Sequence, residues 1–274
     1  MPLHIICLVL FAALLHASWN AMLRGGADRL WSMTVMCMAI AVASVIVAAL
    51  LAPPARASWF YAGLSAVLHV GYNLFLVRSY KSGDLGQTYP IARGVSPILI
   101  VLAASLFAGE RVAPSGLLGI MLVSTGILSL AFTRRRRLPD LPYALGTGFF
   151  IAAYSVVDGI GVRLSGAPMA YTAWMCLLWG VMMPLVYVGL RDTQSLFALR
   201  PGFAAAVAGG LVSLLAYGVV IYAMAYAPMG AVSALRETSV MFAALIGHAF
   251  LGEALTLRKL LACAVIALGT LVIG

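Results

Sequence analysis

Uninterrupted apolar runs of about 20 residues dominate this sequence, and residues 3–22 are an example. A helix of that length crosses the hydrocarbon core of a bilayer. Lipid offers the backbone no hydrogen bonds, so each run must satisfy its own amide groups, as a helix does. The runs also lack the alternation of polar and apolar residues that is typical of a membrane β-barrel. They predict an all-α integral membrane protein.

The composition excludes a water-soluble enzyme. Of the 274 residues, 64% are hydrophobic and only 9% are charged, whereas a soluble domain has about 25% charged residues. The four cysteines lie inside apolar runs and form no C-x-x-C pair, so we expect neither a disulfide framework nor a metal site. The basic residues that give the net charge of +9 lie mainly at the ends of the runs, which indicates membrane topology and not nucleic-acid binding.

Hydropathy predicts ten transmembrane helices joined by short connections, none of which could hold a soluble domain. The expected spans are residues 3–23, 30–52, 58–79, 86–108, 114–132, 141–163, 169–189, 202–226, 228–251 and 256–273.

An internal repeat divides these spans into two halves. Four landmarks recur at an offset of 143 residues: Arg93 with Arg236, Phe107 with Phe250, Gly109-Glu110 with Gly252-Glu253, and Gly126 with Gly269. We predict a first five-helix half at 1–133, a basic connecting loop at 134–140 and a second half at 141–274. Because five is odd, the second half enters the membrane from the opposite side, and such inverted repeats are typical of alternating-access transporters.

The charge distribution predicts the orientation. Twelve basic residues fall on one side of the membrane: Arg24, Arg29, Arg78, Lys81, Arg134–Arg137, Arg191, Arg200, Arg258 and Lys259. Three fall on the other: Arg56, Arg111 and Arg163. Positively charged loops stay in the cytoplasm. We therefore expect a multi-pass protein of the inner (plasma) membrane, with both termini outside and the 134–140 loop cytoplasmic.

The ten short-looped spans, the duplicated halves and the Gly-Glu pair before the last helix of each half resemble the drug/metabolite transporter superfamily, EamA type. The pairs here are Gly109-Glu110 and Gly252-Glu253. The resemblance covers essentially the whole chain and identifies the fold better than the substrate. It implies a ten-span carrier without cofactors, commonly an exporter of amino acids or other small metabolites from a bacterial cytoplasm.

Charged residues inside the spans are candidate functional groups, because a charge at the bilayer centre is costly. Arg93 and Arg236 could bind a carboxylate or phosphate of the substrate, or could pair with loop carbonyls or a nearby acid. Arg236 is not expected to face Glu237, since adjacent helical residues point about 100° apart. Glu237 and Asp158 could bind and release protons. Alternatively they form permanent salt bridges, and Asp158 could be solvated near the end of its span.

Polar and aromatic residues at i, i+3 and i+4 spacing predict a central cavity near the membrane midplane. Hydrogen bonding between helices is the alternative explanation for each stripe. We expect the cavity to be lined by the first, third, fourth, sixth, eighth and ninth spans. The predicted substrate-binding residues are His16, Trp19, Asn20, His69, Tyr72, Asn73, Tyr89, Arg93, Tyr154, Trp174, Ser213, Tyr217 and Arg236.

The fifth and tenth spans have apolar interiors with small residues seven apart, Gly119 with Gly126 and Ala262 with Gly269. They are expected to form a packed scaffold or the surface of a homodimer. Glu110 and Glu253 are expected to cap the helices that follow them.

The sequence therefore favours a transporter that moves a small metabolite by alternating access, with the bilayer as a partner and protons as a candidate coupling ion. An uncoupled facilitator or a multidrug exporter of the same fold is the first alternative. An intramembrane enzyme that processes lipid headgroups is less favoured, because its acids, histidines and cysteines would cluster at one interface.

Overall fold

The computed structural model describes residues 1–79, 85–131, 141–198, 200–251 and 254–274, and in these ranges the regular structure is helical. The first half contributes α1 (Leu3–Gly25), α2 (Arg29–Leu50), a short 3-10 turn η1 (Arg56–Ser58), α3 (Trp59–Ser79), α4 (Leu85–Ala108) and α5 (Pro114–Ala131). The second half contributes α6 (Leu141–Ser165), α7 (Pro168–Leu190), α8 (Thr193–Phe197), α9 (Phe203–Tyr226), α10 (Met229–Arg236), α11 (Ser239–Leu251) and α12 (Leu257–Ile273).

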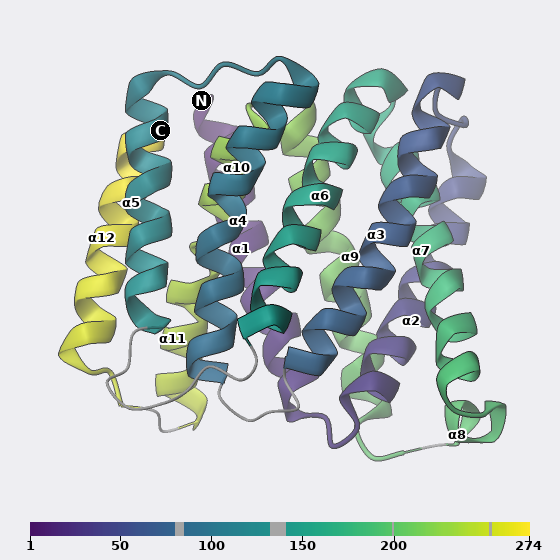
Figure 1. Cartoon of the computed structure of the whole chain (residues 1–274). Helices are drawn as coiled ribbons and strands as arrows, with labels where there is room; N and C mark the ends of the chain where they lie inside the picture. The colour runs from purple at the N-terminus through teal and green to yellow at the C-terminus, as the bar shows by residue number, and fades with distance from the viewer. Residues whose placement is uncertain (80–84, 132–140, 199, 252–253) are drawn as a thin grey trace.

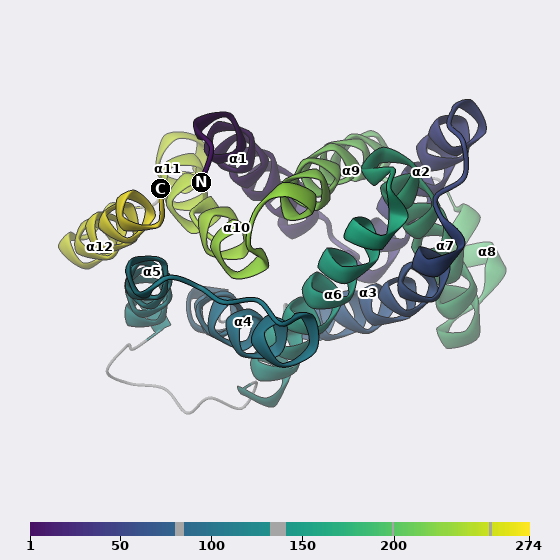
Figure 2. The same ribbon diagram turned by 90° about the horizontal axis from the view of Figure 1, so that it is seen from above.

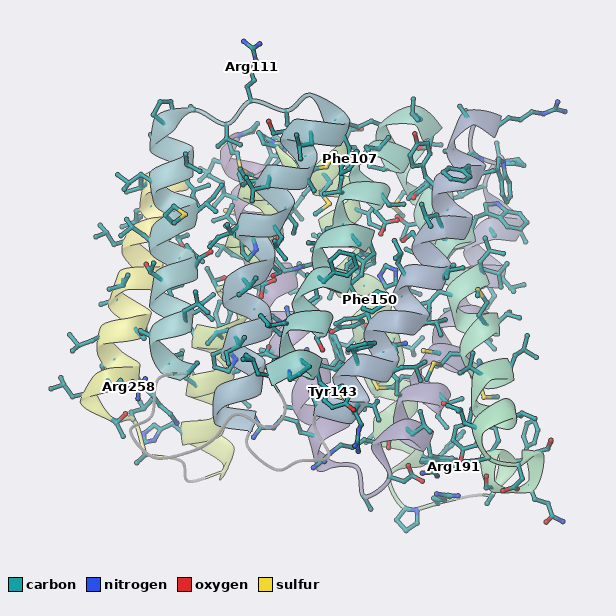
Figure 3. All side chains as sticks on the ribbon, in the orientation of Figure 1. Phe107, Arg111, Tyr143, Phe150, Arg191 and Arg258 are labelled. Carbon is teal, nitrogen blue, oxygen red and sulfur yellow. The ribbon has the colours of Figure 1, made fainter. Side chains whose placement is uncertain are left out.

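The length and hydropathy of the helices fit a multi-pass membrane protein. Within the described residues, nine helical segments are long and apolar enough to cross a bilayer, and one of them combines α10 with most of α11 as Met229–Ala249. Helix α12 has 17 residues and a composition as apolar as the rest. Large apolar side chains cover the outside of the bundle (Figure 3), as expected for a surface that faces lipid.

The predicted span 228–251 is not one continuous helix. Helix α10 ends at Arg236, and Glu237 and Thr238 form a turn before α11 begins at Ser239. The Thr238 hydroxyl donates to the carbonyl of Leu235 at 2.7 Å, and the Glu237 amide N–H donates to carbonyls three and four residues back. A short polar side chain that bonds to the backbone in this way competes with regular helix. The turn occurs where the chain carries its buried charges.

The two halves interleave in space, as Figure 2 shows. Helix α1 packs against α9, α3 packs against α6, and α2 packs against α7, so each of these contacts joins the first half to the second. Helices α5 and α12 pack together at one end of the elongated bundle. Both termini lie toward the same side of the bundle (Figure 1).

The contact between α5 and α12 depends on small residues. A Cβ atom built on Gly119 would lie 2.7 Å from the Gly269 carbonyl oxygen, and one built on Gly269 would lie 2.7 Å from the Gly119 carbonyl oxygen. Gly126 approaches Ala262 in a similar way, with its Cβ position 3.3 Å from that carbonyl. The small faces therefore pack against each other within one chain, and backbone contact between helices is what such residues permit.

Replacing Gly119 by alanine should destabilise the protein by about 1–3 kcal/mol, because the added methyl group would overlap backbone atoms that cannot move aside freely. Thermal unfolding in detergent measures the change. Gly63→Ala is the matched control, because its Cβ would meet nothing within 4 Å, and alanine favours helix by up to about 1 kcal/mol. Equal effects of the two substitutions would show that α5 and α12 do not pack this closely.

Candidate functional site

A cavity lies among α1, α2, α3, α6, α7 and α9, between the two halves of the chain. Eight predicted residues line it: His16, Trp19, His69, Tyr72, Asn73, Tyr154, Ser213 and Tyr217. The expectation that the fourth and ninth spans line it is wrong, since α2 and α7 take their place. The cavity volume that water-molecule centres can occupy is about 30 Å³, which is enough for roughly two water molecules. A metabolite is larger than two water molecules, so the cavity must widen before a metabolite can bind.

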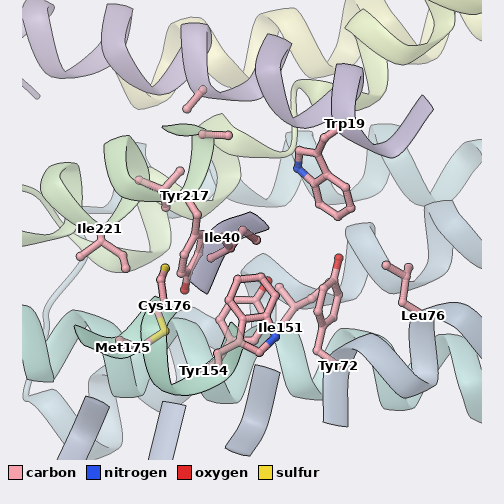
Figure 4. Close-up of a cluster of buried hydrophobic side chains, with 14 of the residues drawn as sticks. Trp19, Ile40, Tyr72, Leu76, Ile151, Tyr154, Met175, Cys176, Tyr217 and Ile221 are labelled. Carbon is pink, nitrogen blue, oxygen red and sulfur yellow. The ribbon is translucent and has the colours of Figure 1, made fainter. Parts of the chain in front are cut away.

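Aromatic rings form one wall of the cavity. The His69 ring stacks on Tyr154 with centroids 4.0 Å apart, and the rings of Trp179 and Tyr217 lie 4.8 and 5.0 Å from His69. Figure 4 shows Trp19, Tyr72, Tyr154 and Tyr217 facing a shared space. The faces of such rings attract cations and stack on planar groups.

Four lining residues escaped the sequence analysis: Met33, Met36, Ile40 and Trp179. The first three are apolar residues in apolar helices, so no polar spacing pattern marks them. Trp179 could have been found, because it lies deep inside α7. Trp174, from the same span, is among the predicted binding residues because it also lies inside the span.

Beside the cavity, two arginines share one carboxylate. Arg93 from α4 places Nη1 3.1 Å from Oε2 of Glu237, and Arg236 at the end of α10 places Nη2 3.0 Å from Oε1. The prediction that Arg236 and Glu237 cannot face each other is wrong. It assumed a continuous helix, whereas the helix stops at Arg236, and the long guanidinium side chain folds back onto its neighbour.

This cluster carries an unbalanced positive charge inside the protein. The side chains of Arg93, Arg236 and Glu237 are 2%, 1% and 0% exposed. Two guanidinium groups and one carboxylate sum to one positive charge, and Nη1 of Arg236 has no hydrogen-bond partner among the described residues. A buried charge without its partner is strongly unfavourable. The cluster is therefore suited to bind an anion.

His16 lies between this cluster and the cavity. The Arg93 Nη2 atom contacts Nε2 of His16, and the Trp19 indole N–H points at Nδ1 from 3.2 Å. Guanidinium and indole groups only donate, and a neutral imidazole accepts at one nitrogen alone. The two donors therefore compete for His16, and a ligand that accepts a hydrogen bond from Arg93 would relieve the competition.

The remaining predicted binding residues do not line the cavity. The Tyr89 ring lies beneath the Arg93 guanidinium at 5.1 Å, and the Asn20 side chain donates to the backbone carbonyl of His16 at 2.9 Å. These two residues position the cluster. Trp174 packs against Trp59 with ring centroids 5.0 Å apart, and nothing in the structure connects it to the cavity.

Asp158 occupies the other side of the cavity wall. It is fully buried in α6, so the expectation that it could be solvated near the end of its span is wrong. Its carboxylate accepts hydrogen bonds from the Tyr171 hydroxyl at 2.9 Å and from the Tyr217 hydroxyl at 2.5 Å. The described ion pairs do not include a salt bridge to Asp158, which was the alternative that the sequence left open. One side chain, Tyr217, separates this acid from the cavity.

Comparison with known proteins decides the family. The model of the EamA-like transporter family matches the chain twice, over residues 3–132 and 140–274. The chain belongs to the EamA-like transporter family. No curated protein matches its sequence. A solved structure described as "Crystal structure of protein" has the same fold, with a TM-score of 0.75 and 20% sequence identity over 98% of this chain and 97% of that one.

One end of this EamA-like transporter is closed by contacts of Glu110. Its carboxylate pairs with Arg163 at 2.5 Å and accepts the Met229 amide N–H at 3.0 Å. The expectation that Glu110 caps the helix after it is wrong, because its carboxylate caps the N-terminus of α10 in the second half of the chain. A negative charge at a helix N-terminus is stabilising. Arg163 also donates to the carbonyls of Met224 and Ala227. Glu253, the counterpart of Glu110, lies outside the described residues.

The opposite end is closed by Asp28, which lies between α1 and α2. Its carboxylate accepts hydrogen bonds from Arg191 and, at 2.8 Å, from Arg200. Figure 3 shows Arg191 and Arg111, the neighbour of Glu110, at opposite ends of the bundle. Partial burial alone would raise the pKa of Asp28, but hydrogen bonds from the Arg191 guanidinium and the Trp31 amide outweigh burial and lower it. The two halves are therefore joined by an ion pair at each end of the bundle.

Acid should weaken the bridge at Asp28. Because the pKa of Asp28 is lower in the folded state, its contribution to stability is present above the unfolded pKa of about 4 and is lost as the pH falls through the folded value. The melting temperature of Asp28→Asn should therefore lie below that of the wild type near pH 7 and approach it near pH 3. Asp192→Asn, in the cap of α8, is the control. A difference in melting temperature between the wild type and Asp28→Asn that stays constant with pH would contradict a lowered pKa of Asp28.

The charge balance of the cluster predicts opposite effects of two substitutions. Glu237→Gln removes the negative charge that the two arginines share and should destabilise the protein by about 3–5 kcal/mol. Arg236→Met leaves the Arg93–Glu237 pair neutral and should have little effect or raise stability. Thermal unfolding in detergent compares them. The reverse order of stability would show that the positive charge is balanced by a group outside the described cluster.

Proposed function

We propose that this protein exports amino acids or related small anionic or zwitterionic metabolites across the bacterial inner membrane by alternating access. Its working parts are two inverted five-helix halves, residues 1–133 and 141–274, with the central cavity between them. The observation that carries the proposal is the cavity, built from both halves and bordered by two buried arginines that share one carboxylate.

The pairing of helices supports the inverted repeat. Suppose that the two halves correspond helix by helix, with α1 matching α6, α2 matching α7, α3 matching α9, α4 matching α10 with α11, and α5 matching α12. The contact of α1 with α9 then becomes the contact of α6 with α3, which is also observed. The contact of α2 with α7, like that of α5 with α12, then maps onto itself. A two-fold relation between the halves has this property. The equivalent arginines, Arg93 and Arg236, meet at the same carboxylate.

The chemistry of the site favours a compound with a carboxylate. A guanidinium with a free Nη1 atom, as in Arg236, can donate to a carboxylate oxygen. The aromatic wall around His69 and Tyr154 can hold an ammonium group or a planar side chain. An amino acid provides both groups at a short separation.

The orientation follows from the charge bias. Arg191 and Arg258 lie at the end of the bundle opposite to Arg111 (Figure 3), as the predicted division into twelve and three basic residues requires. We place the end with Arg191 and the 134–140 loop in the cytoplasm and both termini outside. Export then requires the Asp28 bridge to open toward the cytoplasm and the Glu110 bridge to open toward the outside, in turn.

Transport in reconstituted vesicles tests the proposal. A panel of radiolabelled L-amino acids should give saturable uptake and counterflow, and the corresponding amines without the carboxylate should be carried poorly. Arg236→Gln should reduce amino-acid flux roughly 10–100-fold, since a hydrogen bond to a charged group contributes about 1.5–3 kcal/mol.

Trp174→Phe, outside the cavity, is the control and should transport normally. Conductance that does not saturate would favour the facilitator. Equal transport of amino acids and amines by wild type and Arg236→Gln would refute the role of the arginine as an anion anchor.

A further inference from the structure

The two buried acids of the transmembrane region have different electrostatic surroundings. Glu237 lies between the guanidinium groups of Arg93 and Arg236 and forms an ion pair with each. The hydrogen-bond donors of Asp158 among the described residues are neutral: the hydroxyl groups of Tyr171, Tyr217 and Ser65. A buried carboxylate without a cation is costly, and binding a proton removes that cost.

The titratable groups around Asp158 come from four helices. On its own helix α6 the neighbour is Tyr154, on α7 they are Tyr171 and Cys176, and on α9 it is Tyr217. On α3, His69 stacks on Tyr154.

The charged residues of the other helices that pack on α6 are engaged elsewhere. Arg93 of α4 and Arg236 of α10 both pair with Glu237, and Arg56 of η1 is absent from the described ion pairs. Within the described part of the chain, no cation forms a permanent salt bridge to Asp158.

Protonation of Asp158 would reach the cavity through a single side chain. The Tyr217 hydroxyl donates to Asp158 Oδ2 at 2.5 Å, and the same tyrosine lines the cavity. A protonated carboxyl has one oxygen that donates and fewer lone pairs to accept. The tyrosine hydroxyl that faces the protonated oxygen would then accept a hydrogen bond from the carboxyl group instead of donating one.

Tyr171 has little room to change its position when Asp158 is protonated. Its hydroxyl lies so close to Gly161 that a Cβ there would be 2.4 Å away, and its ring is fully buried. Tyr217 is therefore the tyrosine whose hydrogen bond to Asp158 changes, and the hydrogen bonding of the cavity wall changes when Asp158 binds a proton.

We propose that Asp158, and not Glu237, is the proton-binding residue of this carrier, and that Tyr217 couples its protonation to the substrate cavity. The coupling rests on the proposed transport function, whereas proton binding at Asp158 does not. A proton enters from the side to which the cavity is open and binds one carboxylate oxygen. It leaves to the other side after the halves have rearranged, and no other bond is made or broken.

Infrared difference spectroscopy of the full-length protein in detergent tests the proton site without a substrate. A protonated carboxyl group has a C=O stretch that is separate from the bands of a carboxylate. Between pH 4 and pH 9 the wild type should show such a band that disappears as the pH rises. Asp158→Asn should lack it, Glu237→Gln should retain it, and Asp158→Glu should restore it at a shifted position. A band that persists in Asp158→Asn, or that is lost only in Glu237→Gln, would overturn the assignment.

Vesicles loaded with a pH-sensitive dye test the coupling. When a mixture of the common L-amino acids is added outside, wild-type vesicles should show a change of internal pH together with uptake. Asp158→Asn should retain exchange of labelled amino acids but lose the pH change, and Trp174→Phe, which packs on Trp59 away from Asp158, is the control.

The two proposals fail in different ways. Exchange by the wild type without proton movement would refute coupling and leave the carrier function intact. Absence of exchange together with a titrating Asp158 band would refute the amino-acid carrier and leave the proton site intact.

Discussion

A single buried carboxylate holds the centre of this protein together. Glu237 is shared by Arg93 and Arg236, and these arginines come from α4 and α10, on opposite halves of the chain. Removing Glu237 would leave two buried arginines without their shared counter-charge where water cannot reach them. The interaction joins the two halves to each other. Because two cations share one anion, it also leaves the positive charge that suits the site to an anionic group.

The bridges at the two ends have a different energetic character. Asp28 with Arg191 and Glu110 with Arg163 are partly exposed, and exposed ion pairs contribute only about 0–1 kcal/mol. They can break and reform with little change in free energy, while the buried cluster stays intact. A carrier that opens at alternate ends needs this combination, since each opening must be reversible and the centre must not come apart.

Polar residues in apolar helices made much of the site predictable. Placing Tyr154, Asp158 or Arg93 inside a span costs free energy, so each one indicates an interior position. Lining residues such as Met36 and Ile40 carry no such cost and leave no signal in the sequence. The error over Arg236 and Glu237 has another origin. The turn after Arg236 breaks the helical geometry on which the prediction relied, and hydropathy does not detect a turn inside an apolar segment.

The sequence by itself determined the membrane class, the position of the spans to within a few residues, the recurring landmarks and the family. These properties depend on hydrophobicity and local order, which are written along the chain. Only the tertiary structure decided that Glu110 caps α10, that Tyr217 connects Asp158 to the cavity and that one nitrogen of Arg236 remains unpaired among the described residues. Each of these depends on distances between side chains far apart in sequence, and such distances are set by how the helices pack against one another.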